Sequence, residues 1–260
     1  MAKESENRYT VPMLVKVMEM LEILAKGGQG MTLQELHNSM SYSKSTLFRI
    51  LTTLHELGYV NKDEAGKFFI TKKLFNLGVA ALGEENLVEI ALEPMISLRN
   101  EVKESVMLGA LIEDKVVLLE QVLGSHSFTF TIKTGTRIHL HTSAPGKVLF
   151  AAQNSQRKRA ILSKMSFERF NENTITEPEI FIKEAEKTLS KGYGVDIEEE
   201  LFGVYCIGAP IYNRYGNAIA CVWITAPKGR LSIDHLDDVG AIIKKYTHEI
   251  SVKLGYTQPI

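Results

Sequence analysis

The segment from Ser43 to Leu57 constrains the fold more than any other part of the chain, because its two faces differ sharply. Helical spacing gathers apolar side chains on one face, and these are Leu47, Ile50, Leu51, Leu54 and Leu57. The other face carries hydroxyl, cationic and aromatic groups, mostly within the first two turns. Such a helix is suited to enter the major groove of DNA, although an ordinary amphipathic surface helix has the same pattern.

Two further helices are predicted before this segment. Apolar residues at helical spacing begin after Pro12 and end at a group of glycines between residues 27 and 30. Thr32 and Glu35 then have the spacing of a capping box, which opens a short helix reaching about Met40.

The sequence also predicts where the third helix begins and ends. Ser41 or Ser43 supplies its N-terminal cap, and Gly58 is placed to end it in a left-handed conformation. Two strand-like runs, 59–62 and 67–70, follow on either side of a polar turn. Three helices and a hairpin in this order predict a winged helix-turn-helix.

Composition narrows the class of protein. At 260 residues the chain is long enough for two domains, each with its own core. No apolar run approaches the length of a membrane span, and residues 1–9 have no signal-peptide core. Cys206 and Cys221 have neither metal-binding nor redox spacing, so a cytoplasmic location without metal or cofactor is expected. The net charge of −1 permits DNA binding without supporting it.

The second half alternates strands with helices. Strands are expected at 106–112, 116–122, 128–133, 204–212 and 218–226. Helices are expected at 146–152, 156–164, 178–191 and 232–254. Antiparallel strands interleaved with helices indicate an α+β domain.

Several motifs occur in a characteristic order along the chain. In the first half they are Leu33-Gln34-Glu35-Leu36, Ser43-Lys44-Ser45-Thr46, Arg49-Ile50-Leu51, Leu57-Gly58-Tyr59-Val60 and Leu74-Phe75-Asn76-Leu77-Gly78. In the second half they are residues 135–147, Gly192-Tyr193-Gly194-Val195-Asp196 and the run from Gly203 to Pro210. Together they resemble the IclR family of bacterial transcriptional regulators over about residues 9 to 256.

The resemblance implies three parts: a winged helix-turn-helix DNA-binding domain at 1–78, a linker helix at 79–95, and a GAF-like antiparallel-sheet effector-binding domain at 96–260. It implies an effector-responsive repressor or activator of transcription that is not an enzyme. In the family the linker helix contributes to the dimer contact. We therefore expect a homodimer, or a tetramer formed as a dimer of dimers, on a near-palindromic operator in double-stranded DNA.

The expected DNA-binding residues are Ser43, Lys44, Ser45, Thr46, Phe48, Arg49, Lys62 and Lys67. Hydroxyls and free N–H groups at the helix start suit phosphates, whereas Lys44 and Arg49 reach phosphates or guanine. Thr46 and Phe48 suit thymine methyl groups, although Thr46 has the alternative of packing against the second helix. Phe48 departs from the family, in which His or Tyr is more common. Lys62 and Lys67 have a structural alternative too, because charged residues are common in any solvent-exposed hairpin.

The residues that match the family's effector pocket are Phe130, Ser143, Ala144, Pro145, Asp196, Cys206, Trp223 and Thr225. The expected ligand is a small organic acid, such as a sugar acid or an aromatic acid. Free N–H groups at the helix start near Gly146 would hold its carboxylate, although Pro145 has no N–H to donate. Asp196 would accept hydrogen bonds from ligand hydroxyls. Trp223 stands where relatives commonly have a smaller polar residue.

Three alternatives remain open from the sequence. An enzyme acting on a small acid would use His141, Asp196 and Cys206, with the helix-turn-helix for targeting, but no nucleophile elbow or phosphate-binding glycine loop is present. A metal site would use His139 and His141 on one face of a strand, with Cys206 or Asp196. The third alternative is a winged helix that binds a protein partner and does not contact DNA.

Overall fold

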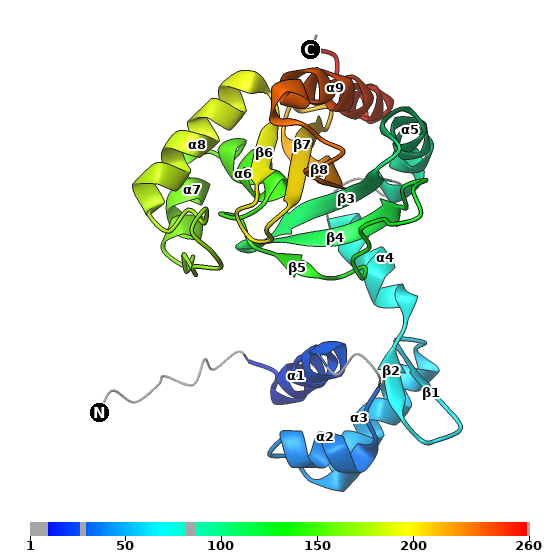
Figure 1. The fold of residues 1–260 in the computed structure, drawn as a ribbon. Helices are drawn as coiled ribbons and strands as arrows, with labels where there is room; N and C mark the ends of the chain where they lie inside the picture. The colour runs from blue at the N-terminus through cyan, green and yellow to red at the C-terminus, as the bar shows by residue number, and fades with distance from the viewer. Residues whose placement is uncertain (1–9, 27–29, 82–86, 259–260) are drawn as a thin grey trace. The chain divides into compact units, whose positions relative to one another are not determined.

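The computed structural model describes residues 10–26, 30–81 and 87–258, and the chain divides into two compact units, Met1–Gly83 and Glu84–Ile260 (Figure 1). We call these the N-terminal unit and the C-terminal unit. Within the described stretches, no helix has the length and apolar character needed to cross a bilayer.

The N-terminal unit has the predicted winged helix-turn-helix architecture. Its elements are α1 (Pro12–Lys26), α2 (Leu33–Ser39), α3 (Lys44–Glu56), β1 (Val60–Lys62), β2 (Phe68–Ile70) and α4 (Lys72–Ala81). The two strands pair antiparallel to form the wing. The apolar face of α3 packs into a core with side chains from α1, α2 and the wing, including Met20, Leu36 and Phe68.

Local sequence signals determine where these helices begin and end. Thr32 and Glu35 form the predicted capping box, in which each side chain accepts a hydrogen bond from the backbone N–H of the other residue. Ser43 caps α3, and Gly58 follows the helix with a left-handed φ of 74°. The prediction that Leu57 belongs to the buried face is wrong, because α3 ends at Glu56 and the Leu57 side chain is 53% exposed.

The C-terminal unit is built on one antiparallel sheet of six strands in the order β5-β4-β3-β8-β7-β6. The strands are β3 (Ser105–Ile112), β4 (Lys115–Val122), β5 (Arg137–Ile138), β6 (Gly194–Ile197), β7 (Val204–Tyr212) and β8 (Ala218–Pro227). Its longer helices are α5 (Leu87–Val102), α6 (Ala144–Ala151), α7 (Ser155–Leu162), α8 (Pro178–Lys191) and α9 (Leu236–Lys253). The predicted α+β class is confirmed.

Helical layers cover both faces of this sheet. Cys221 and Trp223 of β8 share a buried cluster with residues of α6 and α8. Val222 and Ile224, which alternate with them along the strand, are also buried. Because successive strand residues point to opposite faces, the second face must also be covered, and α5 and α9 both pack on the strands (Figure 1). We call the face toward α6 the inner face.

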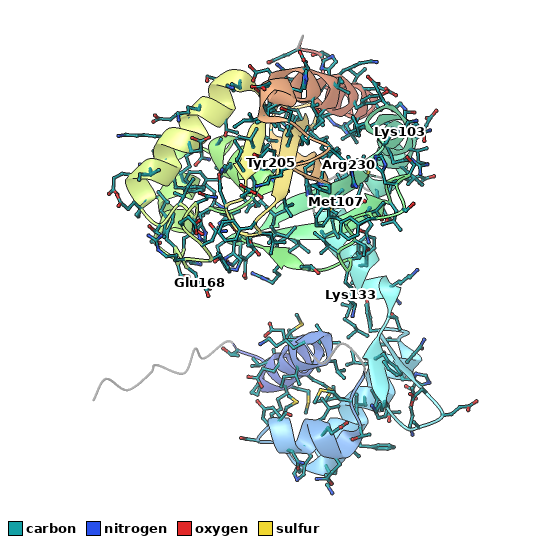
Figure 2. The ribbon with its side chains drawn as sticks, viewed as in Figure 1. Lys103, Met107, Lys133, Glu168, Tyr205 and Arg230 are labelled. Atoms are coloured by element: carbon teal, nitrogen blue, oxygen red, sulfur yellow. The ribbon has the colours of Figure 1, made fainter. Side chains whose placement is uncertain are left out.

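The strand predicted at 128–133 does not form. Side chains rather than a strand ladder hold this segment beside the sheet: the Gln121 amide donates to the carbonyl oxygen of Ile132 at 2.6 Å and accepts from its N–H at 3.1 Å. The Ser105 hydroxyl donates to the carbonyl oxygen of Phe130 at 2.7 Å. Arg230, labelled in Figure 2, binds the Phe128 carbonyl oxygen. The alternating sequence of this segment reflects packing onto the inner face, not pairing.

The predicted linker helix at 79–95 is described only at its two ends. Helix α4 reaches Ala81 and α5 begins at Leu87, and the intervening residues 82–86 lie outside the described residues. Pro94 lies inside α5.

Candidate functional site

The first turn of α3 carries the predicted recognition residues. The Ser43 hydroxyl accepts a hydrogen bond from the Thr46 N–H at 3.3 Å and lies 2.9 Å from the Thr46 hydroxyl. Lys44 and Arg49 are exposed, and within the described part of the chain neither forms a salt bridge. The helix therefore presents Lys44 and a hydroxyl cluster in its first turn, where the helix dipole also favours anions, and Arg49 in its second turn.

Phe48 lies on this exposed side, with 54% of its surface open to solvent. A large aromatic side chain in that position contributes little to the core of the unit. It is available for contact with a partner surface instead.

The wing places its two predicted lysines differently. Lys62 is exposed, and its ammonium group lies 5.4 Å from the centre of the Phe68 ring. Lys67 is half-buried, and its backbone N–H donates to the Asp63 carboxylate at 2.8 Å, which closes the wing turn. Lys62 is thus the better placed of the two for contact with DNA.

In the C-terminal unit, strand register aligns four polar side chains across the inner face. Asp196 of β6 pairs with Cys206 of β7, Cys206 pairs with Thr225 of β8, and Thr225 pairs with Ser105 of β3. The Cys206 sulfur lies 3.4 Å from the Thr225 hydroxyl. We call these four residues the polar row; all are buried. Ser105 was missed from the sequence, because only the β3–β8 register places it opposite Thr225.

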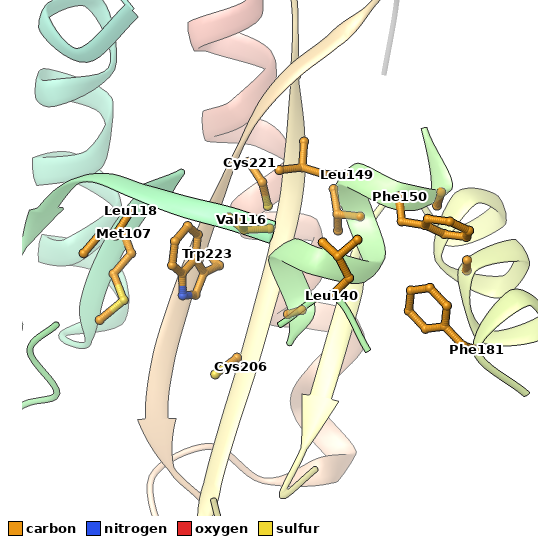
Figure 3. Close-up of a cluster of buried hydrophobic side chains, with 14 of the residues drawn as sticks. Met107, Val116, Leu118, Leu140, Leu149, Phe150, Phe181, Cys206, Cys221 and Trp223 are labelled. Carbon is orange, nitrogen blue, oxygen red and sulfur yellow. The ribbon is translucent and has the colours of Figure 1, made fainter. Parts of the chain in front are cut away.

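The other predicted pocket residues lie around this row. Ala144, Cys206 and Trp223 belong to one buried cluster, in which the Trp223 indole lies beside Met107 (Figure 3). Phe130 packs against this cluster. Trp223 is only 2% exposed, so the indole occupies the inner face beside the polar row. Of the predicted pocket residues, Phe130 is half-buried and the other seven are buried.

The start of α6 offers fewer free donors than expected. Ser143 caps the helix by accepting from the Gly146 N–H at 3.2 Å, and the Lys147 N–H bonds the Ser143 carbonyl oxygen. Pro145 has no N–H, and the N–H groups of Gly146 and Lys147 are already bonded. Of the first four residues of α6, only Ala144 therefore keeps an N–H group for a ligand. The expectation of several free N–H groups near Gly146 is therefore wrong.

A buried ion pair lies next to the polar row and was not anticipated from the sequence. Lys147 is fully buried; its ammonium group donates to Glu199 Oε1 at 2.5 Å and to the Val195 carbonyl oxygen at 2.7 Å. The Glu199 N–H donates to Asp196 at 2.9 Å, which ties the pair to the row. Glu199 Oε2 is buried and has no hydrogen-bond partner among the described residues.

The histidines do not form the metal site that the sequence left open as an alternative. Strand β5 ends at Ile138, so His139 and His141 are not strand neighbours. The His139 ring nitrogen lies 3.0 Å from the Lys115 ammonium group, and His141 Nε2 lies 3.0 Å from the Glu168 carbonyl oxygen. In the described ranges, no group of three or more His, Cys, Asp and Glu residues is arranged to hold a metal ion.

The chemistry of Cys206 disfavours the enzymatic alternative. Burial, reinforced by Asp196, raises the pKa of the Cys206 thiol well above its usual value. A thiol that stays protonated is a poor nucleophile. Burial also lowers the pKa of His141. The His141 ring is hydrogen-bonded to the Glu168 backbone carbonyl oxygen and not to a residue beside the Cys206 thiol.

Two buried carboxyl groups make folding depend on pH. Burial raises the pKa of Asp196 to about 6 and that of Glu199 to about 7. Because both bind a proton more tightly in the folded state, their contribution to stability is complete below about pH 4 and is lost as the pH rises through 6 to 7. We expect the free energy of unfolding in urea to fall by about 2 kcal/mol between about pH 5.5 and pH 8.

The Asp196→Asn variant isolates this effect. It should show a shallower fall over the same range, because one of the two carboxyl groups is gone. His141 opposes the trend in both proteins, since its lowered pKa favours folding as the pH rises. An identical pH profile for the variant and the wild type would contradict the assignment.

Comparison with known proteins gives consistent matches across both units. The model described as the IclR helix-turn-helix domain matches residues 13–64, and that of the C-terminal part of bacterial transcriptional regulator IclR matches residues 79–252. The HTH-type transcriptional regulator KdgR of Escherichia coli K12 is 34% identical over 249 residues, covering 95% of this chain and 94% of its own length.

Two further matches are more distant in sequence. The transcriptional repressor IclR of Escherichia coli K12 is 25% identical, covering 94% of this chain and 90% of its own length. The crystal structure of a transcriptional regulator from Rhodococcus sp. RHA1 has a TM-score of 0.78 and 27% identity, covering 94% of this chain and 98% of that chain.

Proposed function

Because this chain belongs to the IclR family of bacterial transcriptional regulators, we propose that a small organic acid bound on its inner face controls how tightly it holds DNA. The chain is a DNA-binding transcriptional regulator, as its relatives are. The observation that carries the ligand proposal is the polar row, whose Cys206 belongs to the same buried cluster as Ala144 at the start of α6.

The chemistry of this pocket favours a hydroxylated or aromatic acid. The Ala144 N–H at the start of α6 donates to the ligand carboxylate, in the direction that the helix dipole favours. Asp196 and Thr225 offer hydrogen-bond partners to ligand hydroxyls, and Trp223 supplies a flat apolar wall. Phe130, held by Ser105, closes the pocket from the side of the 128–133 segment.

On DNA, Ser43, Ser45 and the first N–H groups of α3 bind a phosphate, and Lys44 and Arg49 bind phosphates or guanine. Lys62 and Lys67 of the wing contact the backbone. One such unit reads few base pairs, so two copies related by a twofold axis are needed, which makes the operator near-palindromic.

The surface of α1 supports this pairing. Val11, which immediately precedes α1, and Leu14, Val15 and Met18 within it lie at helical spacing and are each 41 to 60% exposed. An apolar stripe of this kind is stabilised by contact with a second copy of the same stripe. The protein is then a homodimer, with a dimer of dimers as the larger assembly.

The Phe48 side chain predicts a base preference that can be measured. If its ring contacts a thymine methyl group, replacing that thymine with uracil in the operator should weaken wild-type binding about 3- to 10-fold. The Phe48→Ala variant should bind thymine and uracil operators equally. Gel-shift titration of operators with single uracil substitutions gives both numbers, and equal sensitivity of the wild type and the variant would contradict the contact.

The ligand proposal is tested by fluorescence anisotropy of a labelled fragment of the regulator's own promoter, titrated with a panel of sugar acids and aromatic acids. We expect at least one acid to change the operator affinity saturably. The Cys206→Ala variant should require a several-fold higher concentration of that acid for the same change in operator affinity. The matched control is Cys221→Ala, which changes a buried cysteine outside the polar row and should respond as the wild type does. Loss of the response in both variants, or in neither, would contradict the proposed pocket.

A further inference from the structure

A cavity lies away from the proposed inner-face site, where α8 ends near α9 and the end of β7 (Figure 1). Its volume is about 220 Å³, and it is open to solvent. It contains no residue of the polar row. A smaller hollow shares Leu189, Gly192, Pro210 and Tyr212 with it and continues to Val148 and Ala151 of α6.

The charged side chains that line this cavity are two lysines. Lys191, Lys244 and His248 contribute to its wall, and no Asp or Glu does. Lys191 is paired with Asp237 at 3.1 Å. Lys244, by contrast, has no carboxylate partner among the described residues; its ammonium group donates to the Lys191 carbonyl oxygen at 3.2 Å and has further N–H groups to donate. The cavity therefore has one cation available for an anion.

The same wall carries a flat aromatic surface. The rings of Tyr212 and Tyr256 are stacked, with centroids 5.0 Å apart and planes 19° apart. His248 meets Tyr256 edge-on at 6.2 Å. A planar ring entering the cavity meets aromatic side chains together with Lys244, a combination that favours an aromatic anion over an aliphatic one.

We propose that this cavity is a second ligand site that binds a single-ring aromatic carboxylate, with the carboxylate on Lys244 and the ring against Tyr212 and Tyr256. The volume is below that of pockets for drug-sized ligands, which limits the occupant to one ring. One available cation matches one carboxylate better than a phosphate dianion.

An occupant of this site would act on α9 and the end of α8 together. Helix α9 is tied to α5 by the hydrogen bond from the Tyr246 hydroxyl to Glu101 at 2.7 Å and by the Lys253–Glu93 pair at 3.3 Å. Helix α5 is the first described element of the C-terminal unit. The site is thus placed to add a second chemical input to the regulator, independent of the inner-face pocket.

The test uses 4-fluorobenzoate as the probe and the full-length protein, with binding followed by ligand-observed fluorine NMR. We expect saturable binding in the millimolar range or tighter. Lys244→Gln should weaken this site at least tenfold, and Lys244→Arg should restore most of the affinity. Lys245→Gln is the matched control, because Lys245 is the next residue of α9, is exposed and does not line the cavity; it should bind as the wild type does.

Cys206→Ala, which should weaken acid binding in the inner-face pocket, separates this site from that pocket. If the probe occupies both pockets, Lys244→Gln and Cys206→Ala should each weaken a different one of two binding events. The proposal is overturned if the wild type does not bind the probe at millimolar concentration, if Lys244→Gln binds it unchanged, or if Cys206→Ala alone abolishes all binding.

Discussion

Replacing Lys44 and Arg49 together by alanine is expected to weaken operator binding about a hundredfold without unfolding the protein. Both side chains are exposed on α3 and have no salt-bridge partner in the described ranges, so removing them costs the fold little. A guanine contact of this kind is worth about 1–3 kcal/mol, and each phosphate contact releases bound counterions. Anisotropy titration over a range of salt concentrations should show a lower affinity and a salt dependence reduced by up to about two charges.

A control with the same change in charge distinguishes a specific contact from a general loss of positive charge. Lys183 and Arg159 are exposed on α8 and α7 of the C-terminal unit, and replacing both by alanine should leave operator binding nearly unchanged. If the Lys44/Arg49 double variant bound DNA as tightly as this control, α3 would not be the recognition helix. The winged helix would then serve protein contacts instead.

Trp223→Ala is expected to lower the free energy of unfolding by about 3–5 kcal/mol, as truncation of a buried aromatic residue does. The indole is 2% exposed and is accommodated by glycines on two neighbouring strands. A Cβ at Gly109 would lie 3.0 Å from the indole, and one at Gly208 would lie 2.9 Å from the Trp223 Cβ. The absent side chain of Gly109 thus leaves room for the indole, and that of Gly208 leaves room for the Trp223 Cβ.

Urea denaturation followed by circular dichroism measures this loss. Trp223→Phe should cost less than Trp223→Ala, because a smaller ring fills part of the same space. Phe48→Ala provides the matched control, since it truncates an aromatic residue that is 54% exposed and should change stability by no more than about 0.5 kcal/mol. Equal effects of Trp223→Ala and Phe48→Ala would contradict the packing described.

Much of the N-terminal unit could be predicted from sequence because its signals are local. The Thr32–Glu35 capping box, the cap at Ser43 and the turn at Gly58 each depend on residues within a few positions of one another. Leu57 was misplaced because helical spacing does not reveal that the helix ends one residue earlier.

The inner face was harder to predict because it is assembled by register between distant strands. Ser105 and Thr225 are brought together only by the β3–β8 pairing, and Lys147 meets Glu199 only after α6 packs beside β6. The 128–133 segment has a strand-like alternation, but its backbone is bound by the Gln121 side chain. The individual ligand and DNA contacts stay predictions.

The central claim, that acid on the inner face and operator on α3 control one another, is tested most directly by a reciprocal titration. Trp223, the only tryptophan, reports acid binding from within the pocket, and the titration is run with and without saturating operator DNA. Linkage requires operator to shift the acid affinity by the same factor by which acid shifts the operator affinity, about 5- to 150-fold for typical coupling. An acid affinity that is the same with and without operator would show that the pocket does not regulate DNA binding.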